Sequence, residues 1–282
     1  MRQEALFVSQ TFIKYYFKNA RIVWIRGSVL IVRLLCLAAD VTSNGAPPPN
    51  LSHQATEYLT EIGADAETLF YHALAVLHAP AYRTQNAGAL RQDWPRLPLP
   101  ASLAALVASA ALGREVAALL DVRQPVPGVT HGTIRPELLP LGAIHRRPGA
   151  PDDQLNSAEG HFGLRARWGT RSGGTVLPGA GTTTPTPDAP DHLDIWLNEE
   201  ACWGRVPAAV WATTLGGYPV LKKWLSYRAA PVLARDLLLS EVQEFTRLVR
   251  RLAALLALAP ALDAAYAASQ APAVPAAPPE PV

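Results

Sequence analysis

The chain has few cysteines and little net charge. The first argues against a disulfide-rich secreted protein, and the second gives no sign of a nucleic-acid partner. Only two cysteines occur in 282 residues, Cys36 and Cys202, and they lie far apart in the sequence. A disulfide framework needs more cysteines at closer spacing, so this pair favours a reducing, cytoplasmic location. The net charge is only +2, with 17% charged residues. Nucleic-acid binding therefore has to be judged from where the charges are placed.

The sequence also lacks the short motifs of common catalytic and metal sites. It contains no Gly-x-x-x-x-Gly-Lys-Ser/Thr loop, no Gly-x-Ser-x-Gly elbow and no Gly-x-Gly-x-x-Gly fingerprint. No Cys-x-x-Cys or His-Glu-x-x-His pair occurs, and the seven histidines are scattered, which argues against zinc. Adjacent Glu199 and Glu200 point in different directions on a strand or helix, so we expect solvated or capping roles for them. We expect no catalytic, cofactor-binding or metal-binding residue on this chain.

Helical patterns occupy both ends of the chain. Hydrophobic residues make up 49% of the sequence, which suits a packed core. Residues 52–120 have helical spacing of apolar side chains, and Ser52 and Asp65 are placed to cap the first two helices. A further amphipathic helix is expected to begin at Ser240, where Ser240 and Gln243 match a capping box.

The middle of the chain has a different composition. Eleven of the 19 glycines lie between positions 128 and 181, with many prolines beside them. This density excludes long helices and predicts short strands and long loops over 121–192. Residues 182–187, Thr-Thr-Thr-Pro-Thr-Pro, are expected to form an exposed loop, and alternation over 193–197 predicts a strand. The predicted fold class is therefore α+β, mainly helical at both ends with an irregular, loop-rich, β-containing middle.

The two terminal segments differ from the rest. Residues 1–50 are apolar, aromatic and basic. Their apolar run 22–39 contains Arg26 and Arg33, so we interpret it as a buried strand or helix rather than a membrane span. The tail 269–282 is rich in alanine and proline and is expected to be disordered.

A family resemblance is carried by segments that follow one another in the expected order. They are LFYHALAVLHAPAYR at 69–83, DWPRLPL at 93–99, LDIWLN at 193–198 and TLGGYPVLKKWLSYR at 214–228. Together they resemble the C-terminal specificity region, or target recognition domain, of type ISP restriction–modification enzymes, which are bacterial adenine-N6 DNA methyltransferases. The resemblance covers residues 51–122 and 191–268.

The resemblance implies a DNA-binding target recognition domain over 51–268. Family members join a nuclease, an ATP-driven translocase, an adenine-N6 methyltransferase and this domain in one polypeptide. The methyltransferase signature Asn/Asp-Pro-Pro-Tyr/Phe is absent, so S-adenosylmethionine is expected to bind the parent enzyme and not this chain. The implied partners are double-stranded DNA and a methyltransferase domain or chain, with no membrane. Residues 1–50 depart from the family pattern, which favours a divergent, non-native segment from a truncated or frame-disrupted gene.

Local charge suggests where DNA would bind. Between positions 205 and 251 there are eight Lys or Arg and three Asp or Glu, a local excess of five positive charges that favours phosphate contact. Arginines in the loop-rich middle are candidates for base reading. Trp211 and Trp224 are expected in the core, and Gly216 and Gly217 in a turn that needs positive φ. The candidate DNA-binding residues are Arg165, Arg167, Arg171, Arg205, Lys222, Lys223 and Arg228.

Other interpretations of the same residues remain open. Lys222 and Lys223 could form a solvated helix face over a core tryptophan, and the arginines an ordinary exposed loop. The whole chain could be a helical scaffold or protein-interaction domain without a DNA role. An unrecognised enzyme would require a deep pocket lined by titratable groups. Convergence of the basic residues of 205–251 on one face would favour DNA binding.

Overall fold

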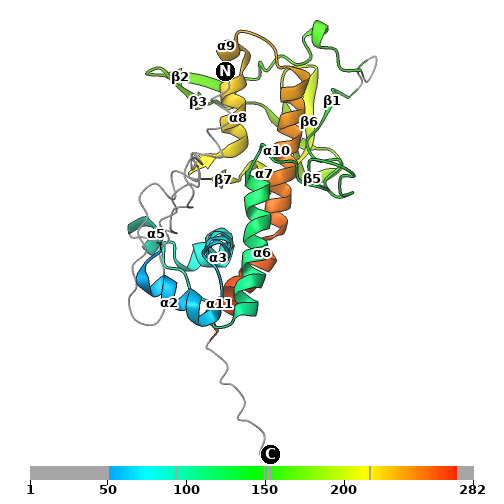
Figure 1. Cartoon of the computed structure of the whole chain (residues 1–282). Helices are drawn as coiled ribbons and strands as arrows, with labels where there is room; N and C mark the ends of the chain where they lie inside the picture. Colours follow the sequence, from blue (N-terminus) through cyan, green and yellow to red (C-terminus); the bar gives the residue numbers. More distant parts are fainter. Residues whose placement is uncertain (1–50, 93–94, 149, 151–153, 216, 272–282) are drawn as a thin grey trace, which may run out of the picture. The chain divides into compact units, whose positions relative to one another are not determined.

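The computed structural model divides into two compact units, which are described separately (Figure 1). Unit 1 comprises the described residues up to Asp121 and from Ala257 onward, and unit 2 comprises Val122–Leu256. The structure describes residues 51–92, 95–148, 150, 154–215 and 217–271. The predictions for 1–50, its apolar run 22–39, Asp93, Trp94, Gly216 and the tail from 272 onward fall outside the described residues. Helices at both ends flank a strand-containing middle, so the α+β prediction is confirmed.

Unit 1 is helical in its described part. Its helices are α2 (His53–Ile62), α3 (Ala66–His78), α4 (Pro80–Gln85), α5 (Ala89–Gln92), α6 (Leu103–Leu120) and α11 (Ala259–Gln270). The Ser52 hydroxyl accepts the Ala55 N–H at 3.2 Å, and the Asp65 carboxylate accepts the Thr68 N–H at 2.7 Å. Both predicted caps are therefore confirmed. Regular structure reaches Gln270, two residues into the expected tail.

Side chains of α2, α3 and α4 hold the proline-rich link between α5 and α6. Its alternate carbonyls accept hydrogen bonds from three side chains: Tyr82 to Arg96 at 2.8 Å, His72 to Pro98 at 2.9 Å and Tyr58 to Pro100 at 2.8 Å. Because Nε2 of His72 donates to this carbonyl, its Nδ1 accepts from the Ser109 hydroxyl of α6 at 2.8 Å. Burial lowers the pKa of His72, so the ring is neutral and joins α3, α6 and the link.

Helices α3 and α6 approach closely at Gly113. A β-carbon at this position would lie 1.8 Å from the carbonyl oxygen of Tyr71. No side chain fits between two backbones at that distance, so glycine is required in the middle of α6 despite its poor helix propensity. The contact explains how two long apolar helices bury their facing surfaces in unit 1.

Among the residues that the structure describes, two helical stretches are long and apolar enough to cross a membrane by length and composition alone. They are Leu103–Leu120, with mean hydropathy 1.7, and Leu239–Gln270, with mean hydropathy 1.6. Core helices of soluble proteins pass the same test. In unit 1 the first of them is packed against α3.

Unit 2 contains an antiparallel sheet with the strand order β1-β6-β5-β4 and two small hairpins. Its strands are β1 (Ala143–Arg146), β2 (Gly169–Ser172), β3 (Thr175–Pro178), β4 (Thr183–Thr186), β5 (Ala189–Trp196), β6 (Ala201–Pro207), β7 (Thr214–Leu215) and β8 (Tyr218–Pro219). Its helices are η1 (Ser157–Glu159), α7 (Ala208–Trp211), α8 (Val220–Arg228), α9 (Ala230–Leu233) and α10 (Leu239–Ala257). Strand β5 confirms the alternation prediction, and the turn glycine Gly217 has a φ of 82° as expected.

The expected exposed loop at 182–187 is instead the edge strand β4. The hydroxyl of Thr186 donates to Asp194 at 2.7 Å, and the indole of Trp196 donates to the Thr184 hydroxyl at 2.9 Å. These bonds hold β4 against β5. The loop prediction was wrong because the threonine hydroxyls pair with a strand that follows later in the chain.

The capping prediction for α10 was also wrong. The helix begins at Leu239, so Ser240 lies inside it. The Glu241 carboxylate accepts the Leu238 N–H at 2.9 Å and forms an ion pair with Arg235 at 2.7 Å. A glutamate at the third helical position that bonds back to the capping residue is one half of a capping box. The helix therefore starts earlier than the Ser240–Gln243 pattern predicts.

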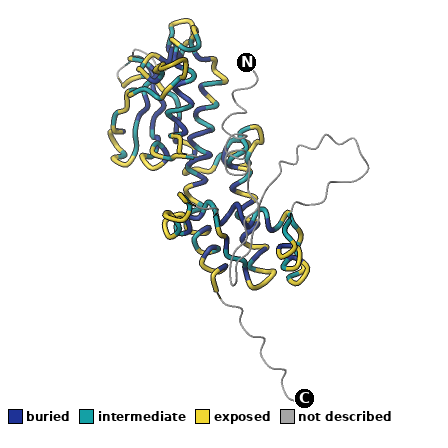
Figure 2. The backbone as a smooth tube through the Cα atoms, turned by 90° about the vertical axis from the view of Figure 1, so that its left-hand side faces the viewer, coloured by how far each residue is buried: buried dark blue, intermediate teal, exposed yellow. Residues whose placement is uncertain are grey.

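The core of unit 2 lies between β6 and α10. The indole of Trp203 is fully buried, donates to the Val242 carbonyl at 3.2 Å and lies 4.2 Å from the ring of Phe245. The ring of Trp224 lies 5.2 Å from that of Phe245, which adds α8 to the cluster. In Figure 2 buried and exposed positions alternate along the long helices, as expected for helices that bury one face.

We predict that Gly113→Ala destabilises the protein, although alanine is the better helix former by about 1 kcal/mol. The added methyl group would press on the Tyr71 carbonyl, and such overpacking costs about 1–3 kcal/mol. Thermal unfolding measures the effect. Gly88→Ala is the matched control, because nothing lies within 4 Å of its β-carbon position. Equal stability of the two variants would contradict the close approach.

Candidate nucleic-acid interface

The predicted DNA-binding residues all lie in unit 2, and some of them meet where the hairpin β2–β3 packs on α8. Strands β2 and β3 are joined by Gly173 and Gly174, both with positive φ. A β-carbon on Gly169 would lie 2.8 Å from the Ser226 carbonyl of α8. Gly169 and Arg171 are two residues apart on one strand, so the Arg171 side chain leaves the hairpin on the face that packs on α8.

Lys223 joins α8 to the same hairpin. Its ammonium group donates to the Val176 carbonyl at 3.0 Å and lies 4.6 Å from the ring centre of Tyr227. Val176 is the residue that pairs with Arg171 across the hairpin. Lys223 and Arg171 are therefore neighbours in space although 52 positions separate them in the sequence. Lys223 is half-buried, so the fully solvated position considered from the sequence is not what the structure shows.

Lys222 lies near the base of the hairpin. Its ammonium group lies 5.4 Å from the ring centre of Trp211, which in turn packs edge-on against Trp168 at 5.4 Å. Trp168 is fully buried and follows Arg167 directly in the sequence. Arg167 and Arg171 are exposed, and in the described part of unit 2 neither side chain has an ion-pair partner. We call Arg167, Arg171, Lys222 and Lys223 the basic hairpin–helix surface.

The other three candidates are bound to acidic side chains. Arg165 pairs with Asp236 at 3.1 Å, Arg228 pairs with Glu244 at 3.5 Å, and Arg205 pairs with Asp188. Arg228 also lies 4.2 Å from the ring centre of Trp224, and its side chain is only 18% exposed. These pairs lie within unit 2, and the DNA contact expected of Arg165, Arg205 and Arg228 stays a prediction.

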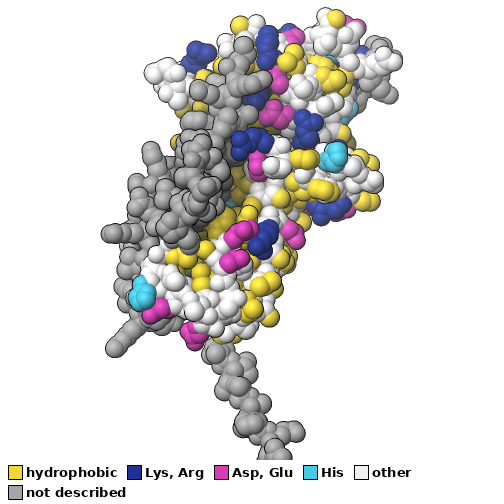
Figure 3. All heavy atoms as spheres, viewed as in Figure 1, with side chains coloured by type: hydrophobic (Ala, Val, Ile, Leu, Met, Phe, Trp, Pro, Cys, Tyr) yellow, Lys and Arg dark blue, Asp and Glu magenta, His cyan; other side chains and the backbone are white. Residues whose placement is uncertain are grey.

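Several of the basic residues that make up the local excess are ion-paired or hydrogen-bonded within the fold. The guanidinium group of Arg250 donates to the Leu139 carbonyl at 2.7 Å, and that of the buried Arg251 donates to the Gln124 carbonyl. All three acids of 205–251 are themselves paired with arginines. The visible face in Figure 3 accordingly shows Lys and Arg over unit 2 with Asp and Glu between them. The basic residues of 205–251 therefore do not all converge on one surface.

Glu200 was considered from the sequence as a candidate for acid–base chemistry. In the structure two arginines hold its side chain. Its carboxylate accepts from Arg146 at 3.2 Å and from Arg147 at 3.1 Å. These hydrogen bonds lower the pKa of Glu200, so the carboxylate stays ionised and ties the end of β1 to the β5–β6 turn. An ionised carboxylate held by two arginines is unsuited to proton transfer near neutral pH.

Sequence reasoning missed the hairpin itself. The Gly173-Gly174 pair, flanked by residues that can alternate in and out, is the usual signal of a tight hairpin. This hairpin signal was present in the sequence. The prediction described the whole of 121–192 as short strands and long loops and did not single it out. The pairing of this hairpin with α8 has no local signal, because α8 begins more than 40 residues later.

The comparisons with known proteins identify one family. A sequence profile described as the Type ISP C-terminal specificity domain matches residues 25–251. No curated protein matches the chain. A cryo-EM structure of a DrdV–DNA complex shares 20% identity and a TM-score of 0.48 over 78% of this chain. A nuclease-deletion mutant of the Type ISP restriction–modification enzyme LlaGI, in complex with a DNA substrate mimic, shares 16% identity and a TM-score of 0.40 over 72% of this chain. The chain spans 20% and 16% of the lengths of those two proteins.

We predict that Trp224 and Arg228 both stabilise the folded state of the protein. Trp224→Ala should cost about 3–5 kcal/mol, because a buried indole is replaced by a cavity. Arg228→Lys keeps the charge but loses the planar stacking on Trp224, so it should lower stability by about 1 kcal/mol. Chemical denaturation measures both, with the exposed Arg171→Ala as the unaffected control. An Arg228→Lys protein as stable as the parent would remove the structural role of this arginine.

Proposed function

This chain belongs to the Type ISP C-terminal specificity domain family, and on that premise we propose that it is a DNA target recognition module. The observation that carries the proposal is the family match over residues 25–251, about four fifths of the chain. The family resemblance predicted from the sequence is thereby confirmed, but its extent differs: the match includes residues 25–50, which were expected to depart from the family, and ends at 251 rather than 268. The two solved structures are named as complexes with DNA or a DNA substrate mimic, but at 20% and 16% identity the proposal does not rest on them.

We place the DNA contact on the basic hairpin–helix surface. Its members are the predicted basic residues that lack an acidic partner in the described part of unit 2. A cation that is not neutralised within the fold can release counterions from the phosphate backbone, which supplies most non-specific affinity. Arg171 stands near the tip of a two-stranded ribbon, and such ribbons can enter the major groove. In this proposal Lys222 and Lys223 contact the DNA phosphates and so position the duplex. Arg167 and Arg171 approach the bases.

The methylation step is assigned to another part of the parent enzyme. All paired strands in the described sheets and hairpins are antiparallel. The described part of the chain therefore does not provide the parallel, doubly wound sheet on which dinucleotides and similar cofactors are commonly bound. We propose that a methyltransferase domain or chain holds S-adenosylmethionine and flips the target adenine, while this module selects the site.

The DNA proposal predicts a defined salt dependence. The chain should bind duplex DNA with an affinity that falls steeply as salt rises. The double variant Arg171→Ala/Lys222→Ala should weaken binding and make the slope of log affinity against log salt shallower by about 2. Its stability should change by less than about 0.5 kcal/mol, because both changes remove exposed or half-exposed charge. Fluorescence anisotropy at several salt concentrations measures the slope.

A matched control removes the same charge elsewhere. Arg83→Ala/Arg91→Ala deletes two exposed arginines of unit 1 and should leave the salt slope of the parent chain. If both double variants lose binding equally, total charge and not the hairpin–helix surface governs the interaction. Absence of binding by the parent chain at low salt would instead favour the protein-interaction alternative.

A separate prediction concerns methylation. The isolated chain should transfer no methyl group from S-adenosylmethionine to DNA, because its described fold offers no cofactor-binding sheet. A methyltransferase region joined to this chain should methylate adenine at one defined sequence, and deletion of residues 51–271 should abolish that preference. Transfer of labelled methyl groups followed by sequencing measures both. Methylation by the purified chain alone would be incompatible with this division of labour.

A further inference from the structure

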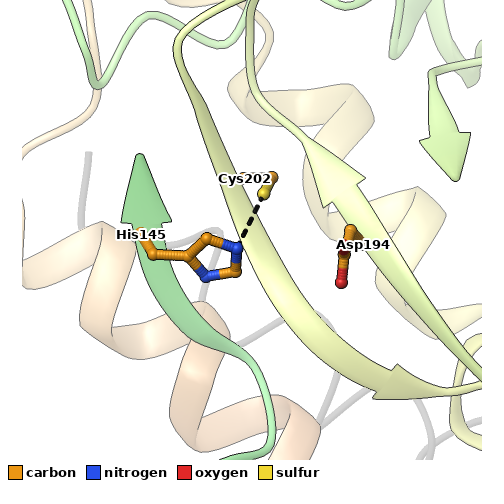
Figure 4. A group of neighbouring side chains, drawn as sticks. All are labelled: His145, Asp194 and Cys202. Carbon is orange, nitrogen blue, oxygen red and sulfur yellow. Dashed lines mark hydrogen bonds between the residues drawn. The ribbon is translucent and has the colours of Figure 1, made fainter. Parts of the chain in front are cut away.

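Three side chains with metal-ligating atoms meet on one face of the unit 2 sheet (Figure 4). His145 lies on β1, Cys202 on β6 and Asp194 on β5, which are neighbouring strands in the order β1-β6-β5. His145 and Cys202 are directly paired in the antiparallel register. The imidazole nitrogen, the sulfur and the carboxylate oxygen all lie within 4.8 Å of one another. Fifty-seven residues separate the first and last of them, so only the sheet brings the group together.

The imidazole of His145 is held in place by the strand beside it. A β-carbon on Gly204 would lie 2.2 Å from Cε1 of this ring, so the absence of a side chain leaves the space that the ring occupies. Nδ1 lies 3.4 Å from the Ala143 carbonyl, and Nε2 lies 3.3 Å from the Cys202 sulfur. When Nδ1–H donates to a carbonyl, Nε2 presents its lone pair, which is the usual arrangement of a metal-binding histidine.

The two carboxylate oxygens of Asp194 differ in their hydrogen bonds. Its Oδ1 atom accepts from the Thr186 hydroxyl at 2.7 Å and from the Arg205 N–H at 3.1 Å. Among the described residues, Oδ2 receives no hydrogen bond. The carboxylate is thus oriented through one oxygen and leaves the other available, as outer hydrogen bonds orient a ligating carboxylate in metal sites.

We propose that His145 Nε2, Cys202 Sγ and Asp194 Oδ2 bind one divalent zinc-type ion, with water in the fourth position. Nitrogen, thiolate sulfur and carboxylate oxygen are the three donors that zinc accepts. Two ligands at tetrahedral angles on one zinc ion are about 3.3–3.6 Å apart. The distance of 3.3 Å between Nε2 and Sγ already matches this value, and all three ligand atoms lie within 4.8 Å of one another. Cys202 and Asp194 are buried while His145 is exposed, which gives the ion and its water an entry path.

A divalent cation bound here would stabilise a Cys202 thiolate and the Asp194 carboxylate at the same time, because it places positive charge beside both. Binding would tie β1, β6 and β5 together by bonds that do not pass through the backbone.

The test uses cobalt(II) as a spectroscopic probe of the full chain, with Cys36→Ser present so that Cys202 is its only thiol. One equivalent of Co²⁺ should produce an intense sulfur-to-cobalt charge-transfer band in the near ultraviolet and visible bands typical of four-coordination. One equivalent of Zn²⁺ should abolish both bands. Zn²⁺ should also raise the thermal unfolding temperature above that measured in chelator.

Variants separate the site from adventitious binding. Cys202→Ser should lose the charge-transfer band, and His145→Gln and Asp194→Asn should each lower zinc affinity more than about 100-fold, beyond the loss typical of an outer hydrogen-bond partner. His145 is exposed on the first strand of the sheet, so His145→Gln is expected to fold. His131→Gln, an exposed histidine of unit 2 outside the group, should behave like the parent. No charge-transfer band, or equal affinity in the His145 and His131 variants, overturns the proposal.

Discussion

Unit 2 depends on the burial of Trp203 between the sheet and α10. The indole donates to the Val242 carbonyl at 3.2 Å and lies 4.2 Å from the Phe245 ring, so strand and helix share one aromatic cluster. Trp224 packs edge-on against Trp203 at 6.3 Å, which fixes α8 to the same cluster. Because α8 carries Lys222 and Lys223, the placement of the basic hairpin–helix surface follows from the aromatic core and not from the charges themselves.

Arginine serves two different purposes in this unit. Arg228 stacks on Trp224 and pairs with Glu244, and the buried Arg251 bonds to a carbonyl of the segment before the sheet. A guanidinium group has five donors in a rigid plane, which suits it to tie loops to helices at several points. Such arginines neutralise or hydrogen-bond within the fold and have little left to offer a phosphate. A count of charges along the sequence cannot separate them from Arg171, whereas the partner of each side chain can.

Some local signals in the sequence predicted local structure well, although the Ser240–Gln243 pattern placed the start of α10 too late. Ser52 and Asp65 cap helices because a cap needs only the three residues that follow it, and the alternation at 193–197 marks a strand by itself. The prediction for 182–187 was wrong because β4 depends on pairing with β5. The same reason hid the partner of Arg165, which is 71 residues away, and the meeting of His145 with Cys202. The family resemblance gave the function class where residue patterns alone could not.

Strand β6 contributes to both the aromatic core and the His145–Cys202–Asp194 group, because its successive side chains point to opposite faces of the sheet. Trp203 faces α10, so Cys202 and Gly204 face the opposite side, where the His145 ring lies. The next residue, Arg205, has a φ of 53°, a conformation that costs about 1–3 kcal/mol for a residue with a side chain. Its N–H is thereby directed to Asp194, at the bulge between Leu193 and Ile195. Bulges re-aim side chains and recur beside functional sites. The Arg205 N–H and the Thr186 hydroxyl together fix the orientation of the Asp194 carboxylate, which lies beside the sulfur and the imidazole.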